Sequence, residues 1–109
     1  MGGHGSLGEF EQLVLLAILR LENGGGAAEV RREIQERARR RASRGALYAT
    51  LDRLEQKGFV SWETESTTPA RGGIPKRRFA VTPRGVEALR ESQEAILRLS
   101  AGLTQVPIG

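Results

Sequence analysis

Apolar residues recur at helical spacing along the first part of the chain. Over residues 7–22, Phe10, Leu13 and Ala17 follow i, i+3, i+7 spacing, and further apolar side chains fill the other faces. A helix that is apolar nearly all round is buried in its own domain or against a second chain. The sequence Asn-Gly-Gly-Gly at residues 23–26 ends this predicted helix.

Two more helices follow, separated by a short turn. Residues 27–39 carry a narrow apolar stripe with charged side chains opposite. Ser43 is a typical N-cap for the next helix, which runs to about Lys57, and Gly58 is the residue expected just after its end. The predicted core stripe of this third helix consists of Ala46, Leu47, Leu51 and Leu54.

The hydrophobic period then changes from helical to alternating. Residues 59–65 and 76–82 each alternate, with Arg77 and Phe79 on one face of the second segment. The residues between them, 66–75, are rich in Thr, Pro and Gly. This pattern predicts a β-hairpin with a long basic tip.

A last helix is predicted from the Thr82-Pro83 pair to about Ala101, because Thr caps a helix well and Pro suits its first position. Its apolar residues form a seam at spacings of three and four that finds no partner in so short a chain, so we expect a second copy to cover it. The residues predicted at this dimer interface come from the seam and from the first helix: Phe10, Leu13, Leu16, Val86, Leu89, Gln93, Ile96 and Leu103.

The predicted order of elements is helix, helix, helix, hairpin, helix. A helix-turn-helix followed by a two-stranded wing is the winged-helix layout. We therefore expect a mostly α protein with a small β-hairpin, in which residues 7–82 form a winged helix-turn-helix domain. Residues 83–103 are expected to form a C-terminal dimerisation helix, and residues 1–6 and 104–109 a disordered leader and tail.

Composition excludes several classes of protein. The 109 residues, 39% hydrophobic and 28% charged, suit one globular domain. No apolar run approaches the roughly 20 residues of a membrane-spanning helix, so no membrane partner is expected. The chain has no cysteine, and its one histidine, His4, lies in a glycine-rich stretch. We therefore predict no disulfide, metal site, cofactor or catalytic centre.

Charge is segregated along the chain. Residues 37–53 hold six arginines against one acidic residue, and residues 66–85 hold five basic residues against none. The remainder carries six basic and twelve acidic residues. Charge separated in this way favours a polyanionic partner, and double-stranded DNA is the partner we expect.

The candidate DNA-binding residues lie on the third helix, the turn before it and the wing. In helix-turn-helix proteins the second helix of the unit enters the major groove, where arginine reads guanine and a hydroxyl donates to phosphate. A cationic hairpin tip suits phosphate or the minor groove. The candidates are Arg40, Arg41, Ser43, Arg44, Gly45, Tyr48, Arg53, Arg71, Lys76, Arg77 and Arg78.

Each candidate also has a purely structural interpretation. Tyr48 is alternatively a half-buried core aromatic with a wet hydroxyl. The wing cations are alternatively charges that protect the edge of a small sheet. Trp62 is expected to cover the base of the hairpin rather than to stack on a base. At the level of the whole protein, the alternatives are a winged-helix module that binds other proteins and a ligand-sensing module without direct operator binding.

Three segments resemble the PadR family of bacterial transcriptional regulators. They are GEFEQLVL at residues 8–15, SRGALYATLDRLEQKGFV at residues 43–60, and the stretch from the RGG sequence at residues 71–73 to Gly85. The resemblance covers about residues 7–103 and is specific, because three motifs occur in order at similar spacing. With a single helix at the C-terminus, the chain is similar to the compact PadR subfamily.

The resemblance implies a homodimeric, sequence-specific repressor in the bacterial cytoplasm. It implies that helix 43–57 and the wing 66–78 bind a pseudo-palindromic operator, and that the C-terminal helix pairs with the partner's N-terminal region. By position, Tyr48 is the family's helix tyrosine, and Lys76, Arg77 and Arg78 are its wing cations. A small-molecule effector is possible and is not identified.

The chain departs from the family pattern at two places. Gly26-Ala27 stands where the family often has a tyrosine–glycine pair entering the second helix. Arg39 stands where a glycine often ends that helix, so we expect the second helix to run longer. The last helix also lacks aromatic residues, which argues against the binding of flat drugs between the two subunits that some compact members show.

Overall fold

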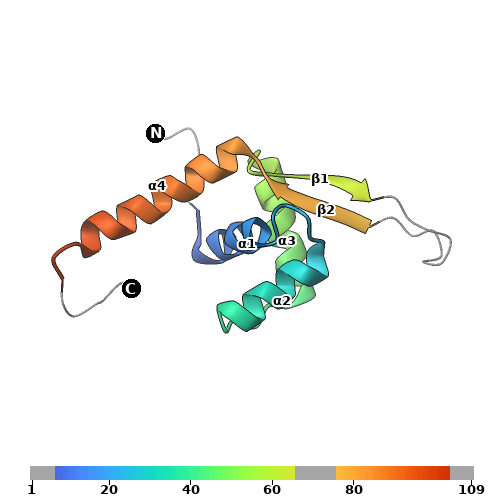
Figure 1. Cartoon of the computed structure of the whole chain (residues 1–109), viewed down its shortest axis with the longest axis horizontal. Coiled ribbons are helices and arrows are strands. Elements are labelled where there is room, and N and C mark those ends of the chain that lie inside the picture. Colours follow the sequence, from blue (N-terminus) through green and yellow to red (C-terminus); the bar gives the residue numbers. More distant parts are fainter. Residues whose placement is uncertain (1–6, 66–75, 104–109) are drawn as a thin grey trace.

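The structure, a computed structural model, describes residues 7–65 and 76–103, and within these ranges all the predicted helices and strands are present (Figure 1). In chain order they are α1 (Glu9–Arg20), α2 (Ala27–Arg37), α3 (Arg44–Gln56), β1 (Val60–Glu65), β2 (Lys76–Val81) and α4 (Pro83–Ser100). The mostly helical fold with a small antiparallel hairpin is thus confirmed. The predicted leader, tail and wing loop, which includes Arg71, lie outside the described residues.

The helix α1 is the centre of the fold. It lies between α4 on one side and the pair α2 and α3 on the other (Figure 1), and it contacts all three helices and β2. Val14, Leu15 and Ile18 are buried almost completely. The predicted burial of this apolar helix is therefore achieved largely within one chain, while Phe10 and Leu13 remain partly exposed.

Local signals in the sequence begin and end α3 as predicted. The Ser43 Oγ accepts a hydrogen bond from the Ala46 N–H at 3.0 Å, which caps the first turn. At the other end Gly58 has a φ of 82°, in the left-handed region. There the Phe59 N–H donates back to the Leu54 carbonyl at 2.9 Å. This arrangement is the Schellman ending, which favours glycine.

Two details of α2 and α3 correct the predictions. The helix α2 ends at Arg37 and does not extend through Arg39, because Arg39 itself takes a left-handed conformation with a φ of 55°. A left-handed conformation is uncommon for a residue other than glycine, so this turn has a cost in backbone strain. On α3, Ala46 is exposed and Thr50 is buried instead. The core stripe follows i, i+3, i+4, i+7 spacing from Leu47.

The hairpin pairs with the turn between α1 and α2 as well as with itself. Trp62 on β1 lies opposite Phe79 on β2. The Phe79 N–H also donates to the Gly25 carbonyl at 3.0 Å. The Asn23 side-chain oxygen accepts from the Val81 N–H at 3.0 Å. The glycine run that the sequence predicts only as a turn therefore holds the wing to the helical body.

The two halves of α4 differ in burial. The Thr82 hydroxyl caps the helix by accepting from the Gly85 N–H at 3.0 Å, and it donates to the Gly58 carbonyl at 2.7 Å. Leu89 is only 4% exposed, so it belongs to the core of the single chain. This placement corrects its assignment to the dimer interface. Nearer the C-terminus, four large apolar side chains are open to solvent: Ile96, Leu97, Leu99 and Leu103.

Gly85 leaves no room for a side chain. A Cβ at this position would lie 2.3 Å from the Phe59 carbonyl oxygen and 2.8 Å from Val81 Cγ1. We expect Gly85→Ala to lower the free energy of unfolding by about 1–3 kcal/mol, because α4 must move away from the hairpin base. Urea unfolding followed by circular dichroism measures this loss.

Gly45→Ala is the matched control. A Cβ at Gly45 meets nothing within 4 Å, and alanine is the better helix former. This variant should therefore unfold at the same or a higher urea concentration than the wild type. An unchanged midpoint for Gly85→Ala would contradict the close packing of α4 on Phe59.

Candidate nucleic-acid interface

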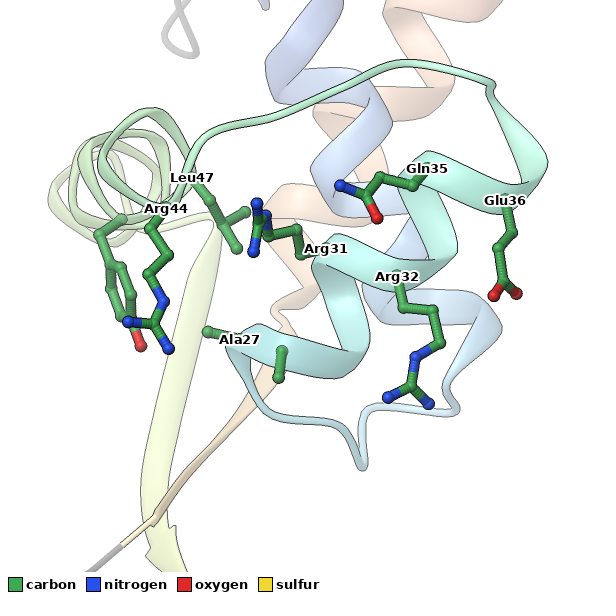
Figure 2. Close-up of a pocket in the computed structure, with 9 residues that line it drawn as sticks. Ala27, Arg31, Arg32, Gln35, Glu36, Arg44 and Leu47 are labelled. Carbon is green, nitrogen blue, oxygen red and sulfur yellow. The ribbon is translucent and has the colours of Figure 1, made fainter.

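The helix α2 and the beginning of α3 flank a hollow in the surface of the protein. Arg31 and Arg32 from α2 and Arg44 and Tyr48 from α3 are among the residues that line it. Figure 2 shows Arg44 and Arg32 on either side of Ala27, and Arg31 directed from α2 toward α3. Three guanidinium groups around one hollow make it attractive to an anion such as a phosphate.

Arg44 and Tyr48 lie one turn apart on the same side of α3, as the sequence predicts. Tyr48 is 45% exposed, which is more open than expected of a core aromatic. Neither side chain makes a hydrogen bond or ion pair with the described part of the chain. Both are therefore available to a ligand that approaches the start of α3.

Two arginines of α2 in this hollow were not among the candidates from the sequence. Arg31 Nε donates to the Ala42 carbonyl at 2.7 Å and so holds the turn before α3. Arg32 is exposed at the edge of the hollow. The sequence signal is their position in the middle of α2, among the charged side chains opposite its apolar stripe.

The turn between α2 and α3 carries a second group of cations. Arg39, Arg40 and Arg41 line a shallow hollow there. The Arg40 guanidinium donates two hydrogen bonds to the Glu9 carboxylate, at 2.8 and 3.0 Å. These bonds, followed by the charge of Arg40, lower the pKa of Glu9 below its ordinary value. Arg40 is thus engaged by α1, whereas Arg41 is exposed without such a partner among the described residues.

Arg53 is part of an ion cluster between α3 and α1. Its Nε lies 3.2 Å from the Glu11 carboxylate, and the Lys57 ammonium lies 3.0 Å from the same oxygen. The Gly8 N–H donates to the other Glu11 oxygen at 2.8 Å. Burial by itself raises the pKa of Glu11, but the hydrogen bonds from Gly8, Lys57 and Arg53 outweigh it and hold the pKa below its ordinary value. Arg53 therefore helps to fix α3 against α1.

Each predicted wing cation of β2 has a partner within the chain. Lys76 Nζ lies 3.0 Å from the Glu29 carboxylate at the start of α2. Arg77 stacks on Trp62, with its Cζ 4.4 Å from the ring centroid. Arg78 lies 3.6 Å from Glu63, in an exposed pair that salt and solvent weaken.

The sequence predicts that Trp62 covers the base of the hairpin, but its side chain is 36% exposed and lies outside the buried core. Its Nε1 donates to the Glu55 carboxylate at 3.0 Å, which ties β1 to α3. Its ring supports Arg77 from the same face of the hairpin, as the alternation of β2 predicts. The pair leaves Arg78 as the most weakly held of the described wing cations.

The residues predicted at a dimer interface are placed in two groups. Phe10, Leu13 and Leu16 lie partly exposed on α1, and the last two line an apolar groove between α1 and α2. Val86 is partly buried, Gln93 and Ile96 are exposed on α4, and Leu103 is exposed just after the end of that helix. Leu97 and Leu99 were missed because they flank the seam rather than lie on it; Leu99 is 83% exposed.

Two other kinds of site are absent from the described residues. Over residues 7–65 and 76–103, no group of three His, Cys, Asp or Glu side chains is placed to hold a metal ion. In the same ranges no helix is both long and apolar enough to cross a membrane.

Three packed helices, followed by a hairpin that continues from the second helix of the helix-turn-helix unit, define the winged-helix class. The sequence matches the profile of the transcriptional regulator PadR-like family over residues 15–91. The chain therefore belongs to the PadR-like family of transcriptional regulators. Among curated proteins, none is similar enough in sequence to count as a match.

Several solved structures share this fold. A PadR-like transcription factor from Bacteroides fragilis is 24% identical, with a TM-score of 0.69 over 84% of this chain and 82% of that one. A PadR-like transcriptional regulator from Bacillus cereus is 18% identical, with a TM-score of 0.67 over 84% of each chain. A winged-helix DNA-binding protein from STIV is 16% identical, with a TM-score of 0.69 over 92% of this chain and all of that one.

Glu11 should make the stability of the protein dependent on acid. Because its pKa is lower in the folded chain, its contribution is complete above the unfolded pKa of about 4.3 and is lost as the pH falls through the folded value. We expect Glu11→Gln to lose about 1–3 kcal/mol of unfolding free energy at pH 7. The gap between variant and wild type should narrow as the pH approaches 3.

Urea unfolding at both pH values measures the effect. Glu94→Gln, which removes an exposed carboxylate of α4 that lies 3.8 Å from Arg98, serves as the control and should unfold like the wild type. If Glu11→Gln were as stable as the wild type at pH 7, the cluster would not hold α3 against α1.

Proposed function

We propose that this protein is a homodimeric transcriptional repressor that binds a pseudo-palindromic operator through α3 and the wing. The observation that carries the proposal is the hollow between α2 and α3, where Arg44 and Tyr48 are exposed and unpaired within the described chain. It lies at the element that helix-turn-helix proteins insert into the major groove. Membership of a family of transcriptional regulators supports the same conclusion.

The exposed side chains fall into two groups: those suited to base recognition and those suited to phosphate binding. Arg44 has a planar fork of donors that suits the two acceptors of a guanine edge. Tyr48 has one hydroxyl and suits a phosphate. Arg32 and Arg41 are exposed; Arg32 lines the same hollow as Arg44, and Arg41 lines a hollow that includes Ser43, so both can neutralise flanking phosphates. The wing contributes Arg78 most readily, because its ion pair with Glu63 is exposed and long.

The proposed dimer follows from the apolar surface that one chain leaves open. Ile96, Leu97 and Leu99 are exposed near the end of α4. The end of this helix extends beyond the helical body (Figure 1). Phe10, Leu13 and Leu16 on α1 are partly exposed and offer a matching apolar surface. A twofold pairing of α4 with these residues of a second copy covers both sets and presents two α3 helices to two half-sites.

Binding-site selection from random duplex DNA with the full chain tests the proposal. We expect enrichment of an inverted repeat whose half-sites are about one helical turn apart. If the protein instead used its winged helix to bind another protein, or sensed a ligand without operator binding, no sequence would be enriched. That outcome would overturn the proposed function.

Substitutions of Arg44 and of Tyr48 should affect DNA binding in different ways. Arg44→Ala should lose about 1–3 kcal/mol of binding free energy on the selected operator and relax the preference at one base pair per half-site. Tyr48→Phe keeps the ring and removes only the hydroxyl. It should weaken binding by about 1 kcal/mol per contact without changing any base preference.

Selection and fluorescence anisotropy at one fixed salt concentration measure both effects. If Arg44→Ala kept the wild-type sequence preference, Arg44 would not be the residue that reads this base pair, and other residues would have to do so. Wild-type affinity in Tyr48→Phe would show that its hydroxyl does not contact DNA.

Ile96 provides the test of assembly. It is 52% exposed in the single chain, so a charge there is harmless to the fold but is buried in the proposed interface. We expect Ile96→Glu to raise the dissociation constant of the dimer by about 100-fold or more. Sedimentation at micromolar concentration should show dimer for the wild type and monomer for the variant.

Glu94→Lys changes a charge on the polar face of the same helix and should leave the dimer intact. Leu89 is unsuitable for this test, because it lies in the core of the chain and its replacement affects folding. A wild-type protein that sediments as a monomer would contradict the proposed dimer.

A further inference from the structure

The buried residues of α3 determine which side chains point directly away from the protein. Leu47, Leu51 and Leu54 are buried against the other helices. Successive residues of an α-helix are separated by about 100° around its axis, so the side opposite this stripe carries a different set. Its members are Gly45, Ala49, Asp52 and Gln56, all exposed. Arg44 and Tyr48 lie beside this set, toward α2.

The outermost side of α3 is therefore small at its first two positions, and Asp52 and Gln56 follow toward the end of the helix. Gly45 and Ala49 add almost nothing beyond the helix backbone, whereas longer side chains occupy the flanks. A helix with such a surface can approach a neighbouring molecule more closely than one that carries long side chains there. Figure 2 views α3 nearly along its axis and shows Arg44 on the side toward α2.

The fold of the chain does not explain Gly45. A Cβ at this position would meet nothing within 4 Å, and its φ is not in the left-handed region that favours glycine. Glycine is a weaker helix former than alanine. The missing side chain therefore serves no packing or backbone requirement of the protein itself, which directs attention to a molecule outside it.

Asp52 is the second residue on the outward side of α3 that the fold of the chain does not explain. It is exposed, and it makes no hydrogen bond or ion pair within the described residues. By contrast, Glu11, Glu29 and Glu55, which lie on α1, α2 and α3, each bind a cation or an indole N–H. A free carboxylate that faces DNA is repelled by phosphates, so it weakens binding unless a base donates a hydrogen bond to it.

Cytosine supplies such a donor in the major groove. Its N4 amino group is the contact that Asp and Glu accept from in base recognition. We infer that Gly45, Ala49 and Asp52 form the base-reading edge of α3, with Asp52 accepting from the N4 amino group of a cytosine. Gly45 and Ala49 allow the helix to lie close enough to the bases for this contact. The inference rests on the proposed function and adds a specificity residue to it.

Binding-site selection with Asp52→Asn tests the inference. The wild-type motif should contain a cytosine in each half-site that is preferred about 5- to 150-fold over other bases at that position. Asp52→Asn should lose this preference, shift it toward adenine, which asparagine reads, and bind random DNA more tightly because a repulsive charge is gone. Glu94→Gln removes an equal charge far from α3 and should keep the wild-type motif.

The outcomes separate the inference from the proposed function. If Asp52→Asn keeps the wild-type motif and only binds all DNA more tightly, Asp52 repels phosphates without reading a base, and the inference is overturned. If the wild type enriches no sequence, the proposed function fails as well. The Arg44 preference should persist in Asp52→Asn, because the two side chains read different base pairs.

Gly45→Ala gives a second readout that does not depend on charge. The added methyl should leave thermal unfolding unchanged or raise its midpoint, as the open space around Gly45 requires. Affinity for the selected operator should nevertheless fall by about tenfold or more, because the methyl separates α3 from the bases. Wild-type affinity in this variant would show that α3 does not approach DNA at Gly45.

Discussion

The burial of α1 is the constraint on which the rest of the structure depends. The α1 side chains Val14, Leu15 and Ile18 are almost completely buried from solvent. The helix itself contacts α2, α3, α4 and β2. With so short a chain, one apolar helix has to supply a large part of the core to every other element. The positions of α3 and of the hairpin, and thus of the candidate interface, follow from their packing on α1.

Acidic side chains outside the two basic segments reinforce this packing. Glu11 binds Arg53 and Lys57 of α3, and Glu29 binds Lys76 of the hairpin. The charge that is segregated along the sequence is therefore partly paired in space. These pairs fix the elements that carry the interface, while Arg44 and Arg41 have no such partner among the described residues. The ion pairs thus orient the interface, and the unpaired arginines supply its attraction for an anion.

The helix α1 contributes both to the position of the candidate DNA-binding helix α3 and to the proposed dimer. One side of α1 holds α3 through Glu11, and its partly exposed residues Phe10, Leu13 and Leu16 face outward. In the proposed dimer a second α4 covers them. The distance between the two α3 helices would then depend on how α4 leaves the body, which the close approach of Gly85 to the Phe59 backbone determines.

The sequence by itself determined the elements and most of their ends. Ser43, Gly58 and Thr82-Pro83 act within a few residues of chain, so their hydrogen bonds and backbone angles can be predicted without knowledge of the fold. The alternation of β2 likewise predicted that Arg77 and Phe79 share a face. Arg39 was the exception, because a left-handed arginine is unfavourable on its own and requires the turn that follows it.

Only the tertiary structure decided which apolar and charged residues are covered. Leu89 and Ile96 are seven residues apart on one stripe of α4, yet the body of the chain covers the first and leaves the second exposed. Arg53 and Arg44 lie in the same basic segment, yet of these two arginines only Arg53 forms an ion pair with Glu11. Periodicity and charge describe one element at a time, whereas burial and pairing depend on the residues that other elements bring beside it.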